Sequence, residues 1–270
     1  MTMTSALYVP GDRSDRFDKA VASGADLVIL DLEDAVAPNR KSIARAAVVD
    51  WLEDTPAGRR PAVEVRVNSG DTGDLAAVAG LGDRSRVGIR LPKVSSVSDV
   101  ESVAELVEEV PICALVEDAS GVEALLEIAR HPRVTSVALG EADLASDLGT
   151  NDPIVLDWLR VRLIVAARAA GLPPPMMGVY VDVHDLKGLR TDSERGRSMG
   201  FVGRTAIHPS QVAVIVDAFR PTPAEVAWAR AVLGAIADGG VDRLASGEMV
   251  DPAMRGRAEA ILSLETRPRC

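Results

Sequence analysis

The chain has 270 residues, 47% of them hydrophobic, which is enough for one barrel-sized domain or two smaller ones. Forty acidic against thirty basic residues give a formal net charge of -10, which argues against nucleic acid or an anionic membrane as a partner. No segment approaches the roughly 18 consecutive apolar residues of a membrane span, and the N-terminal MTMTSALYVP lacks a basic region followed by an apolar one. Two cysteines (Cys113 and Cys270) and three histidines form neither a disulfide framework nor a zinc-ligand spacing. We therefore expect an ordered, cytoplasmic protein in a reducing compartment.

Eight short β-rich segments recur at nearly regular spacing along the chain. Most lie close to Gly or Pro, and helix-like stretches separate them. In chain order they are ALYV, DLVILDLE, AVEVRVN, RVGIRLPK, ICALVE, VTSVALG, MMGVYVD and FVGRTAIH. Eight alternations of strand and helix are typical of a (β/α)₈ TIM-type barrel, whereas an open doubly wound sheet would use about five to seven strands. We predict such a barrel over residues 1–220.

One of the separating stretches, residues 96–110, shows the pattern of a crossover helix. Its sequence, SVSDVESVAELVEEV, places Ser98 and Glu101 at the spacing of a capping box. An apolar stripe follows on one helical face, made of Val100, Val103, Val107 and Val110. We expect this stripe to pack on the barrel.

Residues 221–270 exceed what eight strand and helix units require. Thr222 and Glu225 form a second expected capping box, with Pro223 at the first helical position. A Gly-rich link, DGGVDRLASGEMVD, then leads to a last helix-like stretch near residues 253–265. We therefore predict a C-terminal helical arm over residues 221–270.

Polar side chains crowd the C-terminal ends of the predicted strands, where the active site of such a barrel lies. The residues are Asp31, Glu33, Asp34, Arg66, Asn68, Lys93, Glu117, Asp118, Glu141, Asp143, Asp182 and His208. The stretch ADLVILDLEDAV is the densest, because a buried strand ends there in three carboxylates within four positions. Taken alone, that stretch suggests a metal site.

The third strand, AVEVRVN, has the clearest alternation of side chains. Its valines take one face, and Glu64, Arg66 and Asn68 take the other. Arg66 then points into the barrel mouth, where a guanidinium is costly unless it is paired. The sequence leaves two partners open: an anionic ligand, or a structural ion pair with Glu64 or Glu33.

Glu117 and Asp143 end consecutive strands, which would be neighbours about 4.8 Å apart, so their carboxylates can share one hard cation. The alternative is that both are turn residues, with Asp143 capping the next helix. Lys93, in RLPKVSS, has acidic surroundings that favour a structural or anion-pairing lysine over a Schiff-base lysine. His208 is an acid/base candidate, although a satisfied loop residue is the simpler interpretation.

Taken in order, these motifs resemble the citrate lyase β-subunit-like family, which includes malyl-CoA and citramalyl-CoA lyases. The similarity spans nearly the whole chain. It rests on LYVPGDRSDRFDKA, ADLVILDLEDAVAPNRKSIAR, VEVRVN, RLPK, ALVEDASGV, ALGEADLASDLG, AIHPSQV and SGEMVDPAMRGRAEAIL. The resemblance implies a TIM-type barrel with a C-terminal extension that caps the site of a neighbouring subunit in a homotrimer or hexamer.

The resemblance also implies roles for individual residues. Glu117 and Asp143 would bind Mg²⁺, with Mn²⁺ as a substitute, and Glu117 would also meet the substrate. Arg66 would hold the carboxylate and carbonyl oxygen of a small 2-oxoacid, and Asp251 would be the acid/base residue delivered by the adjacent subunit. Glu33 joins the catalytic set as a residue that orients Arg66, Lys93 or metal-bound water. The residues beside the CoA would be Tyr8, Pro10, Gly11, Arg13, Arg16 and Lys19.

The implied activity is a Mg²⁺-dependent carbon–carbon lyase that cleaves a malyl-, citramalyl- or hydroxymethylglutaryl-CoA-like thioester into acetyl-CoA, or a homologue, and a small oxoacid. A malyl-CoA-type thioesterase is one alternative, and the β subunit of a citrate lyase complex acting on an acyl-carrier thioester is another. Two departures from the family pattern bear on this. Asp118 replaces the Thr of many relatives and is expected to add negative charge near the metal, and Pro252 directly follows Asp251 instead of coming one residue later.

Overall fold

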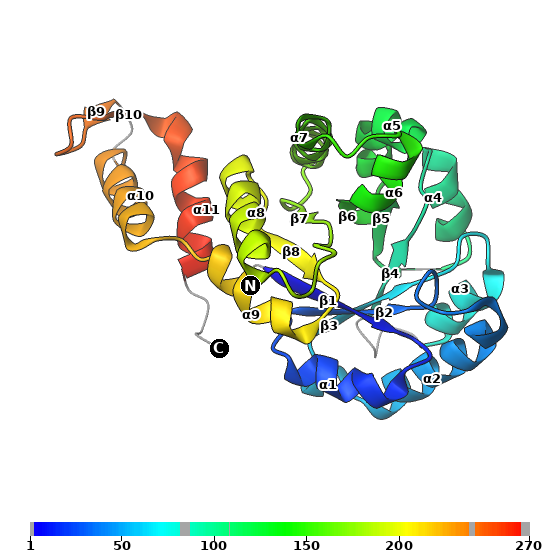
Figure 1. Cartoon of the computed structure of the whole chain (residues 1–270). Helices are drawn as coiled ribbons and strands as arrows, with labels where there is room; N and C mark the ends of the chain where they lie inside the picture. Colours follow the sequence, from blue (N-terminus) through cyan, green and yellow to red (C-terminus); the bar gives the residue numbers. More distant parts are fainter. Residues whose placement is uncertain (1–2, 82–86, 108, 238–240, 266–270) are drawn as a thin grey trace.

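Eight parallel strands curl into a barrel that helices cover on the outside (Figure 1). This computed structural model describes residues 3–81, 87–107, 109–237 and 241–265, so Cys270 lies outside the described residues. The barrel predicted from the eight β-rich segments is confirmed. None of the described helices is long and apolar enough to cross a membrane.

Strands and helices alternate along the chain as far as residue 218, except that two helices, α6 and α7, lie between β6 and β7. The barrel strands are β1 (Ser5–Pro10), β2 (Leu27–Asp31), β3 (Ala62–Arg66), β4 (Val87–Leu91), β5 (Ile112–Val116), β6 (Val134–Leu139), β7 (Met176–Met177) and β8 (Gly203–Ala206). The helices around them are α1 (Phe17–Ala22), α2 (Lys41–Asp54), α3 (Thr72–Gly80), α4 (Val97–Ala104), α5 (Ala119–Arg130), α6 (Glu141–Asp147), α7 (Pro153–Ala169), α8 (Leu186–Met199) and α9 (Pro209–Ala218).

The strand order in the sheet is β6-β5-β4-β3-β2-β1-β8-β7, so the ladder is open between β6 and β7. The seventh strand is shorter than the predicted MMGVYVD segment, because the chain leaves the sheet at Gly178. A Cβ at Gly178 would lie 3.2 Å from the carbonyl oxygen of Leu139, so the backbones approach closely there. Asp182, expected on this strand, instead lies in the following loop, where it accepts hydrogen bonds from the His184 and Asp185 amides.

The core has an inner and an outer part, which follow from the alternation of side chains along each strand. On β2, Val28 and Leu30 join the large cluster between strands and helices, whereas Leu27 and Ile29 join a smaller cluster with Ala6. Both faces of the strand are therefore buried, as in other parallel sheets. Each such aliphatic side chain contributes about 1.5–3 kcal/mol when fully buried.

One of the two predicted helix starts, that of α10 (Pro223–Ala235), is confirmed, and the other, that of α4, lies at a different residue. Thr222 and Glu225 form the predicted capping box of α10. At α4, however, the capping box is formed by Ser96 and Asp99, not by Ser98 and Glu101. Ser96 has an extended backbone and accepts from the N3 amide, so the helix begins two residues earlier than expected.

The last part of the chain folds into a lobe of its own beside the barrel (Figure 1). It comprises α10, the strand pair β9 (Asp242–Arg243) and β10 (Met249–Val250), and α11 (Arg255–Glu265). A separate apolar cluster holds it together, made of Ala229, Val232, Ile236, Val250 and Ala258. We call this lobe the arm.

Candidate active site

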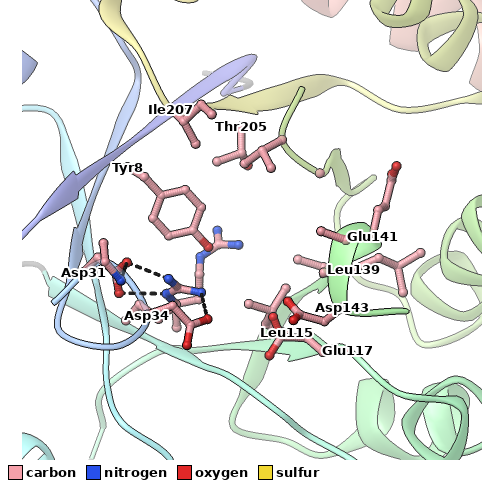
Figure 2. Close-up of a pocket in the computed structure, with 18 of the residues that line it drawn as sticks. Tyr8, Asp31, Asp34, Leu115, Glu117, Leu139, Glu141, Asp143, Thr205 and Ile207 are labelled. Atoms are coloured by element: carbon pink, nitrogen blue, oxygen red, sulfur yellow. Dashed lines mark hydrogen bonds and ion pairs between the residues drawn. The ribbon is translucent and has the colours of Figure 1, made fainter. Parts of the chain in front are cut away.

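A pocket of about 410 Å³ opens at the carboxyl ends of the strands (Figure 2). All eight strands, or the loops that follow them, contribute to its walls, including β4 through Arg90 and β7 through Met177. Arg66, Glu117, Asp143 and Asp31, four residues of the predicted rim, line this pocket together. The structure therefore gathers at one site residues that are up to 112 positions apart in the sequence.

Arg66 ends β3 and points into the barrel mouth, as the alternation of its strand predicts. Its Nε and Nη2 donate to the two carboxylate oxygens of Asp31 at 2.8 and 2.6 Å. Its Nη1 also lies 3.1 Å from Glu33 Oε2 and 3.4 Å from Asp34 Oδ2. Burial opposes the charged form of Arg66, but the hydrogen bonds and charge of Asp31 outweigh it and raise the pKa of Arg66. Glu64, one of the two expected partners, pairs with a different arginine.

That second arginine, Arg90, was not recognised from the sequence. It is the register partner of Arg66 on β4, and its Nε donates to Glu64 at 2.8 Å. The ring of Tyr8 lies beside both guanidiniums, with its centroid 5.0 Å from Cζ of Arg66 and 5.8 Å from Cζ of Arg90. Burial raises the pKa of Tyr8, so the phenol stays neutral. In the sequence, only the alternation of side chains along this apolar strand could have indicated that Arg90 faces the barrel interior.

Glu117 and Asp143 follow the neighbouring strands β5 and β6 and face the same pocket (Figure 2). Glu117 is 5% exposed, and its Oε2 accepts a hydrogen bond of 2.9 Å from the Lys93 amide. Burial raises the pKa of Glu117 to about 7, and the negative charges of Glu33 and Asp143 add to this effect. Asp143 lies in the first turn of α6, whose N-cap is Gly140. No side chain among the described residues caps α6, so the alternative role of Asp143 as a helix cap is wrong.

These two carboxylates fit a magnesium ion in their chemistry and placement. Mg²⁺ is usually held by one or two carboxylates, with water and substrate oxygens filling its other positions. Within the described ranges, no group of three or more His, Cys, Asp or Glu side chains is placed to hold a metal, so a site here rests on a pair. A bound cation would also favour the ionised form of Glu117, whose pKa burial now raises.

The carboxylates of the LDLED stretch lie beside this pair and not at its centre. Asp31 accepts hydrogen bonds from Arg66, and the buried Glu33 forms ion pairs with Arg66 and Lys93. The interpretation of Glu33 as a residue that orients Arg66 and Lys93 matches this placement. Asp34 is exposed at the pocket rim.

Asp118 does not add its charge to the pocket, contrary to the sequence-based expectation. It is the N-cap of α5, and its Oδ1 accepts from the Gly121 amide at 2.7 Å. Its Oδ2 accepts from the Ser95 hydroxyl. Both oxygens of this carboxylate are therefore engaged in these hydrogen bonds, and Asp118 does not line the pocket, unlike its sequence neighbour Glu117.

Two further rim residues have structural roles. His208 is the exposed N-cap of α9, where its Nδ1 lies 2.7 Å from Ser210 Oγ, so the interpretation as a satisfied loop residue is confirmed. Asn68 donates to the Leu32 carbonyl oxygen and to Asp74 at 2.8 and 2.7 Å. Both side chains stabilise loops around the mouth.

The residues expected beside the CoA are divided between two places. Tyr8 and Pro10 line the pocket, with Tyr8 within the barrel. Gly11 is buried where a Cβ would lie 2.8 Å from the Asp31 carbonyl oxygen. Arg16 and Lys19 are exposed near the start of α1, and Arg13 pairs there with Asp15. These three basic side chains are outside the pocket lining, on the surface that follows β1.

Asp251 lies in the arm, where it caps a short 3₁₀ turn (Pro252–Met254). Its Oδ1 accepts from the Ala253 amide at 2.9 Å, a position that the directly following Pro252 suits because proline favours the first position of a helix. Asp251 does not line the pocket of its own chain.

A network of ion pairs beside the pocket spans the open edge between β6 and β7 and was also missed. Arg160 of α7 donates to both oxygens of Glu141 at 3.0 and 2.7 Å and to Asp192 of α8 at 3.2 Å. Arg204 of β8, 1% exposed, donates to Asp192 and to the Gly178 carbonyl oxygen. Arg160, Glu141 and Asp192 lie in helices, where charged residues usually face solvent, so the sequence did not reveal their pairing.

The fold and the pocket define a TIM-barrel protein with a carboxylate-rich mouth built around a buried arginine. Within that class, the chain belongs to the HpcH/HpaI aldolase/citrate lyase family, whose family model matches residues 4–209. A second model, described as a C–C bond lyase of the TIM-barrel fold, matches residues 171–264. The resemblance inferred from the motifs is thus confirmed.

Individual relatives show the range of activities in this family. The chain is 41% identical over 238 residues to a (3S)-malyl-CoA thioesterase of Cereibacter sphaeroides, covering 86% of this chain and 82% of the relative. It is 33% identical over 300 residues to an L-malyl-CoA/beta-methylmalyl-CoA lyase of the same organism, covering 95% and 92%. The crystal structure of the CitE protein of Mycobacterium tuberculosis, in complex with magnesium, acetoacetate and coenzyme A, superposes with a TM-score of 0.80 at 32% identity and covers 98% of both chains.

Proposed function

We propose that this protein is a Mg²⁺-dependent carbon–carbon lyase that cleaves a short β-hydroxyacyl-CoA into acetyl-CoA, or a homologue, and a small oxoacid. The observation that carries the proposal is that Arg66, Glu117 and Asp143 line one pocket. A guanidinium beside a carboxylate pair suits a substrate fragment with its own carboxylate and a neighbouring oxygen. The malyl-CoA relatives and the magnesium-bound CitE structure support the same chemistry.

Each residue has a defined task in this reaction. Arg66, fixed by Asp31, binds the substrate carboxylate and stabilises negative charge on the oxygen that becomes the carbonyl. Glu117 and Asp143 would hold Mg²⁺, which supplies a Lewis acid that lowers the pKa of the substrate hydroxyl. In cleavage the hydroxyl proton passes to water, the electron pair of the breaking carbon–carbon bond goes to the thioester enolate, and Asp251 gives a proton to the methylene carbon of that enolate. In the condensation direction Asp251 removes a methyl proton instead.

To act as this acid/base residue, Asp251 has to be delivered by another copy of the chain, because it does not line the pocket of its own chain. We therefore propose a homotrimer or hexamer in which the arm of one copy completes the site of the next. Helix α7 offers an apolar surface for such contacts. Four exposed side chains lie on one face of it at spacings of four, three and four residues, namely Ile154, Trp158, Val161 and Val165.

The CoA would enter from the β1 side of the mouth. Pro10 lines the pocket there, and beyond it lie the exposed Arg16 and Lys19 and the half-buried Arg13, available to the nucleotide phosphates. Tyr8 would contact the acyl end of the substrate instead, because its ring lies inside the barrel next to Arg66. Tyr8 is thus proposed to contact the acyl group, whereas the resemblance implied a position beside the CoA.

Hydrolysis of the same thioester is the second candidate, favoured by the 41% identity to a malyl-CoA thioesterase. Water reaching the thioester carbonyl would release free hydroxyacid and CoA. A third candidate, the β subunit of a citrate lyase complex, agrees with the description of the family model. That subunit would need a carrier-protein thioester as substrate.

Product analysis tests these candidates directly. Purified protein is incubated with malyl-, citramalyl- and hydroxymethylglutaryl-CoA, with Mg²⁺ or with EDTA, and the products are separated. A lyase gives acetyl-CoA and an oxoacid only with Mg²⁺, and a thioesterase gives free CoA and a hydroxyacid. No cleavage of any free CoA thioester, together with turnover of the carrier-protein thioester, would leave the citrate lyase subunit as the activity.

A further inference from the structure

Lys93, which follows β4, has a backbone conformation that is unusual for a lysine. Its φ is +55°, in the left-handed region that glycine adopts without cost. Among the described residues, only one other that is not glycine, Glu109, has a positive φ. Strained backbone of this kind persists only where surrounding contacts hold it, and such residues gather at functional sites.

The strained backbone of Lys93 serves the proposed metal site. Its amide does not take part in strand pairing but donates to Glu117 Oε2 at 2.9 Å. The amide of the next residue, Val94, donates to the carbonyl oxygen of Leu115 on β5. On the other side of Glu117, a Cβ at Gly140 would lie 2.5 Å from Oε1. The Glu117 carboxylate is therefore held between the Lys93 amide and the start of α6.

The side chain of Lys93 is about half exposed and forms an ion pair next to this strained backbone. Its Nζ lies 2.5 Å from Oε1 of Glu33, whose other oxygen faces Arg66 at 3.1 Å. The Glu33 side chain is 5% exposed, so this carboxylate depends on the two cations for its compensation. One lysine thus contacts both the carboxylate proposed to bind metal and the carboxylate that orients Arg66.

We propose that Lys93 is a positioning residue whose left-handed amide aims Glu117 at the metal and whose ammonium, paired with Glu33, both maintains that backbone and orders Arg66. This inference rests on the proposed metal-binding role of Glu117. It explains why a lysine occupies a position at which the backbone alone would favour glycine. It also separates two functions, one of the amide and one of the ammonium, that substitutions can test individually.

The test compares Lys93→Gly with Lys93→Ala. Glycine adopts the left-handed conformation without a side-chain partner, so Lys93→Gly keeps the amide on Glu117 and binds Mn²⁺ within about threefold of wild type. Alanine lacks both the ammonium and this freedom, so its backbone relaxes and Mn²⁺ binding weakens by about tenfold, the scale expected for one lost hydrogen bond to a charged group. Both variants weaken the binding of pyruvate, used as a probe of Arg66, whereas Lys93→Arg restores it by keeping the charge. Calorimetric titration of the full-length protein measures both affinities without any turnover.

Glu109 provides the matched control, because its φ is also positive, at +58°, and it is exposed and does not line the pocket. Glu109→Gly should melt at a higher temperature than Glu109→Ala, because glycine adopts a positive φ without strain, and both variants should leave Mn²⁺ binding unchanged. Equal Mn²⁺ affinity of Lys93→Gly and Lys93→Ala, or stronger binding by the alanine variant, would overturn the inference. Wild-type protein that binds no Mn²⁺ would instead refute the proposed metal site.

Discussion

Asp31 and Arg66 are register partners at the ends of the neighbouring strands β2 and β3, and two parallel hydrogen bonds join their side chains. Asp31 also accepts hydrogen bonds from the Glu33 and Ala35 amides, so the loop after β2 holds the Asp31 carboxylate in place. The carboxylate in turn holds the guanidinium of Arg66. The orientation of Arg66 is therefore set before any ligand arrives. Such preorganisation reduces the ordering cost of binding a substrate carboxylate.

Replacing Asp31 by asparagine should reveal the strength of this contact. Asp31→Asn keeps the size of the side chain but leaves the largely buried Arg66 without its main counter-charge, so the free energy of unfolding should fall by about 3 kcal/mol. Urea denaturation measures this change. Asp15→Asn removes the exposed partner of Arg13 and should change stability little. Equal stability of the two variants would show that Asp31 does not support Arg66.

The sequence predicted the position of Arg66 but not its main partner. Alternation along β3 was enough to place Arg66 at the mouth, because side chains of a strand alternate strictly between two faces. Its pairing with Asp31 depends on the register between β2 and β3, which sequence alone does not provide. The same limit applies to Arg90. Alternation along β4 places it on the inner face, but its pairing with Glu64 depends on the register between β3 and β4.

Other features depend on backbone geometry that has no signature in the sequence. The chain leaves the sheet at Gly178 after the short strand β7, and the left-handed backbone at Lys93 occurs without a glycine to indicate it. Asp118 was expected to add negative charge near the metal, but it caps α5 and does not line the pocket. Strand periodicity therefore predicted the barrel and the residues at its mouth, whereas loop and cap geometry decided which of them share the pocket.

The raised pKa of Glu117 predicts a distinctive pH dependence for the metal-free protein. Burial raises the pKa of this carboxyl from its ordinary value of 4.5 to about 7 in the folded chain, so between these pH values the folded state binds a proton that the unfolded state has lost. The contribution of Glu117 to stability is therefore fully present below pH 4.5 and declines as pH rises through 7. Glu117→Gln, which stays neutral, should be more stable than wild type at pH 8 and similar to it at pH 5. Denaturation in EDTA at both pH values measures this difference, and identical behaviour of the two proteins at pH 8 would contradict the raised pKa.

Metal binding should show the opposite pH dependence, because Mg²⁺ requires the ionised form of Glu117. Below pH 7, each unit of acidification should weaken Mg²⁺ binding by about tenfold, and above pH 7 the affinity should level off. Calorimetric titrations from pH 6 to 8 measure the slope. Affinity that does not change over this range would show that Glu117 is already ionised at pH 6.

Arg160 should contribute to stability because it bridges helices across the open edge of the barrel. Its guanidinium joins Glu141 of α6 to Asp192 of α8, next to the gap where β6 and β7 share no ladder. Arg160→Gln leaves these two carboxylates without that cation, and the free energy of unfolding should fall by about 3 kcal/mol. Arg168→Gln, at an exposed position on the same helix, is the control and should leave stability close to wild type. Similar denaturation midpoints for both variants would mean that the barrel edge does not depend on this bridge.

Complementation between inactive variants tests whether Asp251 acts on the site of another copy. Arg66→Ala disables the pocket of its own chain, and Asp251→Ala disables the arm. In mixed oligomers, a chain with an intact pocket can receive an intact arm from its neighbour, so random mixing of equal amounts should restore about a quarter of wild-type activity. Each variant refolded alone is the control and should stay inactive. If the mixture also stays inactive although light scattering shows that mixed oligomers form, Asp251 does not reach the pocket of a neighbouring subunit.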